Sequence, residues 1–237
     1  MGPGRTGGET ASLNGSVDVR PPDPAQMRRE YQGRDSYPLL TEDQLAGTWL
    51  DQFTAWFADA VEAPGIVEPN AMIVATASPE GAPSTRTVLL KGVDELGFVF
   101  FTNYGSRKAT ELAANPQVSL VFPWHPTGRQ VIVCGLAERV ERSETETYFA
   151  TRPRASQLGA WASPQSEVVS RADLDQAMAE ITHRFPDGAP VPAPPHWGGL
   201  RVRPLTVEFW QGRPSRLHDR LRFRRAESAW VVERLAP

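Results

Sequence analysis

The sequence has little of what disulfide, metal or membrane chemistry requires. Its one cysteine, Cys134, excludes an internal disulfide. That cysteine lies in the apolar run 131–134, which predicts a buried structural thiol and not a nucleophile. The four histidines are scattered without metal-ligand spacing, so we expect no metal. No apolar run approaches membrane-spanning length and no signal segment opens the chain, so we expect a cytoplasmic protein with no membrane partner.

Lysine is also scarce. The chain has 25 basic residues, and only Lys91 and Lys108 are lysines. Because arginine is used everywhere else, the two lysines indicate a need for a compact point charge in the stretch 86–111, which contains both. The net charge of −3 argues against a general nucleic-acid binder, so any phosphate recognition must be local. The sequence has no Walker-type loop, dinucleotide fingerprint or nucleophile elbow.

Length and composition are those of an ordinary globular protein. With 237 residues, of which 40% are hydrophobic and 22% charged, the chain can form one large domain or two small ones. Residues 1–26 are rich in Gly, Pro, Ser and Asp and have almost no large apolar side chain, which predicts a flexible tail. We expect one folded domain over residues 27–237.

The stretch 86–111 begins with a pattern typical of a β-hairpin. The apolar runs 87–90 and 98–101 are rich in β-branched and aromatic residues and flank a polar turn. Alternation places Arg86 and Lys91 on different faces of the first strand, near its opposite ends. These two side chains can therefore contact separate parts of one elongated ligand.

A helix is predicted directly after this hairpin. Ser106 stands where it can cap a helix over residues 107–115, which Pro116 ends. Arg107 and Lys108 fall in its first turn, where the helix dipole and the unpaired N–H groups favour anions. The pattern favours a phosphate held jointly by cations and amides, although chance basic residues on a surface hairpin give the same pattern.

Hydrophobic periodicity predicts the remaining elements. A capping box of Thr41 and Gln44 predicts a helix that ends at Pro64-Gly65, and Ser143 with Glu146 predicts another through about residue 151. An amphipathic helix with its apolar stripe inward is predicted over residues 171–185. Strands are predicted at residues 71–77, 84–91, 117–122 and 130–140, and in a closing meander from 205 to 235. These elements predict a mainly β, antiparallel barrel with helices packed on it.

Two further charged groups are candidates for ligand contacts. In the expected strand 215–223, alternation places Arg216, His218 and Arg220 on one face, where they repel one another unless an anion lies among them. A solvated outer face explains them equally well. The basic and aromatic cluster 27–31 fits a solvated helical turn or an arm that closes over an anionic ligand.

Longer strings give a more specific signal. From Arg28 to the C-terminus the chain contains, in order, RTVLLK, FFTNYGSRKA, NPQVSLVFPW, YFATRPRASQLGAWAS, WGG, EFWQG, RLHDR and ERLAP. With these strings it resembles the pyridoxine/pyridoxamine 5′-phosphate oxidase family. The resemblance implies an FMN-binding split β-barrel that forms a homodimer with FMN at the subunit interface.

The resemblance also implies roles for individual residues. It implies FMN contacts, some from the partner subunit, at Arg86, Thr87, Val88, Leu89, Leu90, Lys91, Phe101, Thr102, Arg107, Lys108, Gln130, Gln165, Ser166, Trp210 and Arg220. It implies substrate contacts at Arg28, Arg29, Glu30, Tyr31, Lys91, Tyr148, Arg152, Ser156, Arg216, Leu217 and His218. Among these, Arg107 and Lys108 would bind the FMN phosphate. Arg216 is the expected electrostatic orienter and His218 the candidate for proton handling.

The reaction that the resemblance implies is an oxidation with O2 as electron acceptor. Pyridoxine 5′-phosphate or pyridoxamine 5′-phosphate becomes pyridoxal 5′-phosphate, with H2O2 as a product and ammonia released from the amine. Two alternatives stay open. One is a related split-barrel oxidase that acts on another flat substrate, such as a phenazine precursor, and the other is a non-enzymatic carrier of flavin or pyridoxal phosphate.

Overall fold

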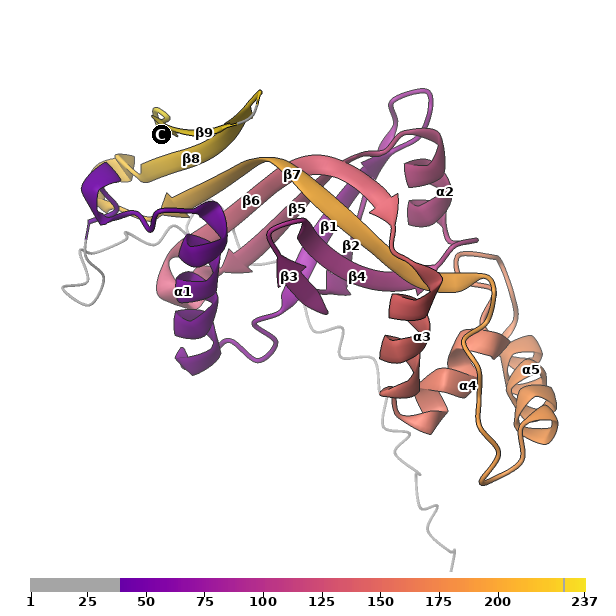
Figure 1. Cartoon of the computed structure of the whole chain (residues 1–237). Helices are drawn as coiled ribbons and strands as arrows, with labels where there is room; N and C mark the ends of the chain where they lie inside the picture. The colour runs from indigo at the N-terminus through magenta and orange to yellow at the C-terminus, as the bar shows by residue number, and fades with distance from the viewer. Residues whose placement is uncertain (1–38, 228) are drawn as a thin grey trace, which may run out of the picture. The chain divides into compact units, whose positions relative to one another are not determined.

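The structure, a computed structural model, describes residues 39–227 and 229–237 (Figure 1). The expected tail over residues 1–26 and the expected substrate contacts Arg28, Arg29, Glu30 and Tyr31 lie outside these residues. They and the domain boundary at residue 27 therefore stay predictions. Among the helices that the structure describes, none combines the length and the apolar character needed to cross a membrane.

One antiparallel sheet contains the nine strands of the described residues (Figure 1). The strands are β1 (Ala71–Ala77), β2 (Pro83–Leu89), β3 (Gly92–Asp94), β4 (Gly97–Asn103), β5 (Gln117–Trp124), β6 (Arg129–Arg139), β7 (Trp197–Gln211), β8 (Asp219–Ala226) and β9 (Ala229–Arg234). Their order is β2-β1-β5-β6-β7-β4-β3, with β8 paired to β7 and β9 to β8. The prediction of a mainly β, antiparallel fold is confirmed.

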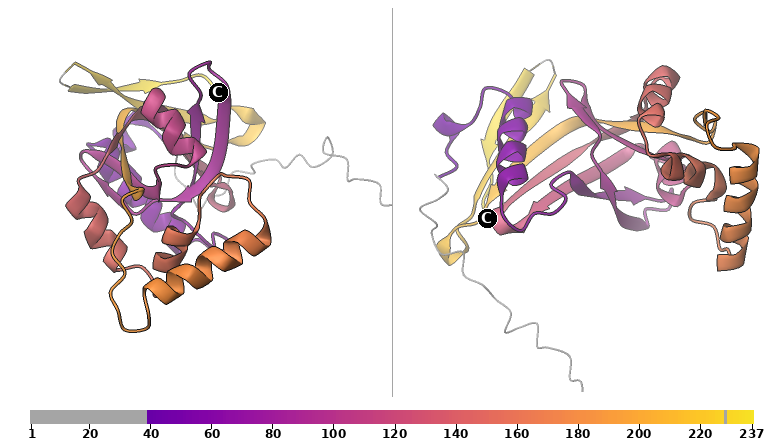
Figure 2. Two further views of the ribbon diagram at one scale, coloured as in Figure 1. Left: turned by 90° about the vertical axis from the view of Figure 1, so that its right-hand side faces the viewer. Right: turned by 90° about the horizontal axis from the view of Figure 1, so that it is seen from below.

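The strand β7, 15 residues long, determines how the sheet divides. On one side β6 pairs with most of its length. On the other side its first part pairs with β4, and its second part pairs with β8. The sheet therefore has two ends joined by β7, and Figure 2 shows how strongly the strands twist between them.

The main core lies between α1 (Trp49–Glu62) and the sheet. Alternation along the strands turns Phe122 of β5 and Val131 of β6 inward, and neither has exposed area. Phe53 of α1 is equally buried and packs edge-on against Phe98 and Phe122, with ring centroids 5.0 Å apart in both pairs. Such edge-to-face pairs stabilise a core beyond the area that they bury.

A second core cluster joins α3 (Arg142–Ala150), α4 (Arg154–Ala162) and α5 (Arg171–Arg184) to the start of β7. The helix α2 (Arg107–Ala114) instead packs into the main core through Ala109 and Leu112. The second cluster contains Phe149 and Leu158 of α3 and α4, Trp197 of β7, and Val191 and Ala193 of the preceding connection. Pro153 is the N-cap residue of α4 and separates it from α3.

The predicted start of the first helix is wrong. Thr41 precedes only a short 3-10 turn, Glu42–Gln44, and its side chain makes no capping hydrogen bond. The helix begins at Trp49, because Thr48 adopts an extended conformation and its Oγ1 accepts the backbone N–H of Asp51 at 3.1 Å. Thr48 therefore caps the helix, which is the role that the sequence predicted for Thr41.

The predicted hairpin pairs differently from the expectation. Residues 87–89 belong to β2, which pairs with β1, while β4 pairs with β3 around the expected polar turn. The chain changes direction at Leu90, which is 6% exposed and donates its backbone N–H to the carbonyl of Asn70 at 2.8 Å. The strand β2 therefore ends at Leu89, with β1 and not β4 as its partner.

The predicted cap of α3 is wrong, and the predicted inward stripe of α5 is confirmed only in part. No side chain caps α3, whose N-cap residue is Glu141, so Ser143 and Glu146 form no capping box. The apolar stripe of α5 is only half-buried, and Met178 is 36% exposed. A cap depends on where the preceding strand ends, and burial depends on the neighbouring element, so neither follows from local sequence.

The outer face of the sheet is partly apolar. Cys134, predicted to be buried, is exposed there, because alternation along β6 turns Val131 and Val133 inward and Cys134 outward. On β1, Ile73 is 37% exposed, and Leu136 of β6 is 41% exposed. This face leaves apolar side chains in contact with solvent in the single chain.

Candidate functional site

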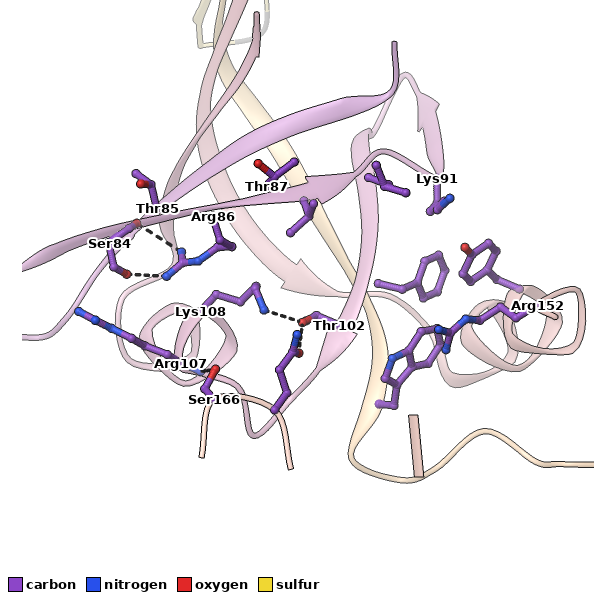
Figure 3. A pocket seen from close by; sticks show the side chains of 16 residues that line it. Ser84, Thr85, Arg86, Thr87, Lys91, Thr102, Arg107, Lys108, Arg152 and Ser166 are labelled. Atoms are coloured by element: carbon purple, nitrogen blue, oxygen red, sulfur yellow. Dashed lines mark hydrogen bonds between the residues drawn. The ribbon is translucent and has the colours of Figure 1, made fainter. Parts of the chain in front are cut away.

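A cavity of about 580 Å³ lies between β2, β4 and the first turn of α2 (Figure 3). The residues expected at the cofactor and substrate sites that line it are Arg86, Thr87, Val88, Leu89, Lys91, Phe101, Thr102, Arg107, Lys108, Tyr148, Arg152, Gln165 and Ser166. The fold thus gathers residues from five separate segments of the chain.

One end of the cavity is lined by three cations, two of which lie close to a carboxylate outside the lining. Arg86 reaches from β2, and Arg107 and Lys108 from the first turn of α2 (Figure 3). Glu111 accepts a hydrogen bond from Nε of Arg107 at 2.8 Å and lies 3.7 Å from Nη2 of Arg86. This end therefore has an excess of positive charge, which favours an anionic ligand.

Lys108 is the most deeply buried of these cations, at 6% exposure. Its Nζ donates to hydroxyl oxygens, Thr102 Oγ1 at 3.1 Å and Ser106 Oγ at 3.3 Å, and it has no ion pair with a described carboxylate. Burial, together with the nearby Arg86, lowers the pKa of Lys108 to about 8. A buried ammonium group held only by hydroxyls fits a site for a phosphate group.

The first turn of α2 is closed by the loop at residues 163–166. The backbone N–H of Arg107 donates to Ser166 Oγ at 3.2 Å, and Gln165 Oε1 accepts from Thr102 Oγ1 at 3.2 Å. Ser106 stands at the N-cap as predicted, but its hydroxyl donates to the carbonyl of Asn103 instead of capping the helix. Gln165 and Ser166 are thereby fixed beside the cations, and their contacts with FMN stay predictions.

Aromatic side chains form the other end of the cavity. Phe101 stacks on Tyr148 with ring centroids 4.1 Å apart and on Trp197 with centroids 5.4 Å apart. The guanidinium of Arg152 lies 4.5 Å from the Trp197 ring centroid, and its Nη1 is buried without a hydrogen-bond partner among the described residues. Together with Lys91 at the same end (Figure 3), Arg152 provides a second place for an anion.

Other expected residues lie at the opposite end of β7 and do not line this cavity. They are Gln130, Trp210, Arg216, Leu217, His218 and Arg220. Gln130 pairs with Trp210 across β6 and β7, and the ring centroids of Trp210 and His218 are 4.6 Å apart. Along β7, Trp210 lies roughly 40 Å from Trp197, which contacts the cavity.

Arg216 and His218 do not lie on a strand, contrary to prediction. Residues 214–216 form a 3-10 turn in which Ser215 and Arg216 have φ of 56° and 61°, and β8 begins only at Asp219. The backbone N–H of Arg213 donates to Nδ1 of His218 at 3.0 Å, so a neutral ring carries its proton on Nε2. Burial and the charge of Arg216 lower the pKa of His218.

Comparison with known proteins places this fold and cavity in a family. Residues 57–184, more than half of the chain, match the family described as Pyridoxamine 5′-phosphate oxidase. The chain belongs to the pyridoxamine 5′-phosphate oxidase family. Residues 197–237 match the Pyridoxine 5′-phosphate oxidase C-terminal dimerisation region, which begins at β7. The resemblance seen in the sequence is thus confirmed.

Two relatives of the chain within this family are named pyridoxine/pyridoxamine 5′-phosphate oxidase. The protein from Salinispora arenicola is 60% identical and covers 90% of this chain and 96% of its own length. The protein from Streptomyces avermitilis is 59% identical, with 91% of this chain and 96% of its own length covered. The similarity therefore extends over nearly the whole of both chains.

Solved structures share the fold. PhzG from Burkholderia lata, in complex with tetrahydrophenazine-1-carboxylic acid, superposes with a TM-score of 0.77 at 31% identity, over 85% of this chain and 98% of its own. An FMN-binding protein from Nostoc punctiforme, described as related to pyridoxamine 5′-phosphate oxidase, has a TM-score of 0.64 at 19% identity, over 78% and 97%. The split-barrel fold expected from the resemblance is confirmed.

Two further residues expected at the site do not line the cavity, and three residues that line it were not expected from the sequence. Leu90 points into the core, and Ser156, on the first turn of α4, does not line the cavity. Ser84, Thr85 and Trp197 line the cavity but were not expected there. The string WGG contains Trp197, and its position after a proline-rich connection, where β7 begins, is the signal that could have identified it.

Proposed function

We propose that this protein oxidises pyridoxine 5′-phosphate and pyridoxamine 5′-phosphate to pyridoxal 5′-phosphate with bound FMN and O2. The observation that carries the proposal is one cavity with an anion site at each end and an aromatic wall beside it. A flat phosphorylated cofactor and a flat phosphorylated substrate need this arrangement. The names of the relatives at 60% and 59% identity support the same reaction.

The three-cation end is the proposed site of the FMN phosphate. Arg107, Lys108 and Arg86 present N–H donors there, and Lys108 is buried without a carboxylate partner among the described residues. When bound, the flavin supplies the redox chemistry, taking a hydride equivalent from C4′ of the substrate and passing its electrons to O2 with formation of H2O2. The protein binds, orients and shields the reacting groups.

The aromatic end is the proposed site of the substrate phosphate. Lys91 and Arg152 supply positive charge there, and the unpartnered Nη1 of Arg152 is a buried donor that a phosphate oxygen can satisfy. Tyr148 adds its hydroxyl beside them. Ser156 stays a predicted contact, although it lies outside the cavity lining.

We propose that a second subunit completes the site. Gln130, Trp210 and Arg220 were expected at the cofactor, and Arg216 and His218 at the substrate, yet all five lie at the far end of β7. The match to a dimerisation region over residues 197–237 supports a homodimer, and so does the apolar outer face that includes Ile73. In such a dimer the far end of one chain meets the cavity of its partner, with FMN at the interface.

His218 and Arg216 then have distinct roles at the substrate ring. Arg216 keeps its charge and orients the substrate by electrostatic attraction. His218 is neutral at neutral pH, because burial and Arg216 lower its pKa, and its Nδ1 accepts the Arg213 N–H. In this geometry the proton is on Nε2, so His218 can donate a hydrogen bond to the substrate. The ring oxygen of the substrate is the remaining candidate for taking up a proton.

The relative PhzG makes a phenazine precursor the second candidate substrate. Its structure holds tetrahydrophenazine-1-carboxylic acid and shares the fold, at 31% identity. The paired cations Lys91 and Arg152 favour a phosphate over a single carboxylate, because a dianion can satisfy both.

A cytoplasmic location of the protein stays a prediction.

An anaerobic titration followed by air tests the proposal. The flavin-loaded protein is titrated with pyridoxine 5′-phosphate and, separately, with pyridoxamine 5′-phosphate or tetrahydrophenazine-1-carboxylic acid. We expect both phosphorylated compounds to bleach the flavin absorbance, and air to restore it with pyridoxal 5′-phosphate as product. Bleaching by the phenazine compound alone assigns the second candidate. A flavin that binds but never bleaches indicates a carrier.

A further inference from the structure

A buried carboxylate lies against two of the cations at one end of the cavity, although it does not line the cavity itself. Glu111 stands on α2 and is 6% exposed. Its Oε1 accepts the Nε–H of Arg107 at 2.8 Å, and its Oε2 lies 3.7 Å from Nη2 of Arg86. Arg86 and Arg107 come from different elements, β2 and α2, so this one side chain links the two.

Two hydroxyl groups extend the link from Glu111 to Arg86. Thr76 Oγ1 and Ser84 Oγ both donate to Oε2 of Glu111, the second at 2.6 Å. The same two oxygens accept hydrogen bonds from Nη1 and Nη2 of Arg86, each at 2.6 Å. A hydroxyl has one proton, so donation to Glu111 leaves only lone pairs to face Arg86. The carboxylate thereby fixes the direction of all four hydrogen bonds.

Glu111 is ionised throughout the physiological range. Burial alone raises the pKa of its carboxyl group, but the hydrogen bonds from Ser84, Thr76 and Arg107 outweigh burial and lower the pKa to about 2. The side chain is therefore an acceptor at every oxygen. A carboxamide in its place has one acceptor oxygen and one donor nitrogen, so it must face either the hydroxyls or Arg107 with a donor.

We propose that Glu111 is a positioning residue that orients Arg86 and Arg107 toward the phosphate of bound FMN. The proposal rests on the FMN site proposed above. Arg107 depends most on this contact, because its side chain is 60% exposed and no other side-chain hydrogen bond of Arg107 is present among the described residues. Glu111 also offsets part of the repulsion among the three cations before the phosphate arrives.

Comparing FMN with riboflavin tests this role, because riboflavin lacks only the phosphate. Both are titrated into the flavin-free protein, as wild type and as Glu111→Gln, with flavin fluorescence as the readout. We expect FMN affinity to fall roughly tenfold in the variant, which is the loss typical of one charge-assisted hydrogen bond. Riboflavin affinity stays within about twofold of wild type, since the isoalloxazine contacts are unchanged.

Glu146→Gln is the matched control. Glu146 accepts the Nε–H of Arg142 four residues earlier at 2.9 Å, the same arrangement as Glu111 and Arg107, but on α3 and outside the cavity. We expect this variant to bind both flavins like wild type. If Glu111→Gln lowers both affinities equally, its role is merely structural and the proposal is wrong. A rise in FMN affinity also contradicts it, since Glu111 then acts as a competing anion.

Ser84→Ala keeps the test decisive if Glu111→Gln does not fold. It removes one of the two bridging hydroxyls and leaves the carboxylate in place. We expect a selective loss of FMN affinity, smaller than that of Glu111→Gln, and an unchanged ratio of FMN to riboflavin affinity contradicts the proposal. Failure of the wild-type protein to prefer FMN over riboflavin overturns the FMN site itself, which separates the two hypotheses.

Discussion

Lys108 is the residue whose environment reveals most about the ligand. Its ammonium group is buried beside Arg86, and its partners are hydroxyl oxygens. Burial and Arg86 lower the pKa of Lys108 to about 8, so the flavin-free protein holds this charge at a cost. A bound phosphate reverses that cost, because it supplies the missing counter-charge. We therefore expect Lys108 to make binding of the proposed FMN phosphate depend on pH.

We predict that FMN affinity is constant from about pH 7 to 8 and decreases above pH 8, by up to roughly tenfold per pH unit. The pKa of free Lys108 is lowered, so above pH 8 the side chain is neutral and must take up a proton before it can bind the phosphate. The lowered pKa also affects the stability of the flavin-free fold. Between pH 8 and the ordinary lysine pKa of 10.5, Lys108 is protonated in the unfolded chain but neutral in the folded one, so the free energy of unfolding increases as the pH rises. Flavin fluorescence titrations at a series of pH values measure the first effect.

Lys108→Met is the control for this pH dependence. It removes the titrating group and keeps a similar apolar stem, so FMN should bind more weakly and without the decrease above pH 8. Riboflavin binding should show no such decrease in either protein. An identical pH profile in wild type and Lys108→Met contradicts the assignment of Lys108 to the phosphate.

Single residues were predictable where their chemistry is unusual in the sequence. Lysine is rare in this chain, and cations in the first turn of a helix are unfavourable, so Lys108 and Arg107 stood out. Glu111 did not, because a glutamate on a helix is ordinary until Thr76 and Ser84 are brought against it by the sheet. Contacts between distant segments carry no local signal.

At the scale of elements, local signals decided the type but not always the bounds. The strand at residues 71–77 and the helix after Ser106 form as predicted. The first helix starts at Trp49 instead of Thr41, since the stronger cap is Thr48. The segment around Arg216 is a turn with positive φ, which alternation of side chains alone cannot distinguish from a strand.

The position of the α1 cap gives a stability prediction. Thr48→Ala should lower the free energy of unfolding by about 1 kcal/mol, because it removes the side-chain acceptor of the Asp51 N–H. Thr41→Ala should change it much less, since the Thr41 side chain makes no capping hydrogen bond. Urea unfolding at one protein concentration measures both. Equal losses in the two variants contradict the observed helix start.

At the scale of the whole molecule, β7 separates two groups of residues that the proposed site needs together. The cations and aromatic residues lie at its first end, and Trp210 and His218 lie near its second end. The sequence predicted the antiparallel fold and most of the cavity lining. It could not show that the two groups are far apart within a chain, because distance along β7 appears only once the strand is built.

Mixing two inactive variants tests the central claim, an oxidase site shared between two subunits. One variant carries Arg107→Ala with Lys108→Ala and should lose FMN, while His218→Ala should keep FMN and lose turnover. Each is measured alone, then both are unfolded, mixed equally and refolded with FMN. Formation of pyridoxal 5′-phosphate from pyridoxine 5′-phosphate is the readout.

We expect mixing to restore roughly a quarter of wild-type activity, because half of the dimers are mixed and each mixed dimer has one intact site. That site combines the unaltered cavity of the His218→Ala chain with the unaltered far end of its partner. If mixed dimers form, as tags of different mass on the two chains would show, and no activity returns, the site is not shared and the central claim is wrong.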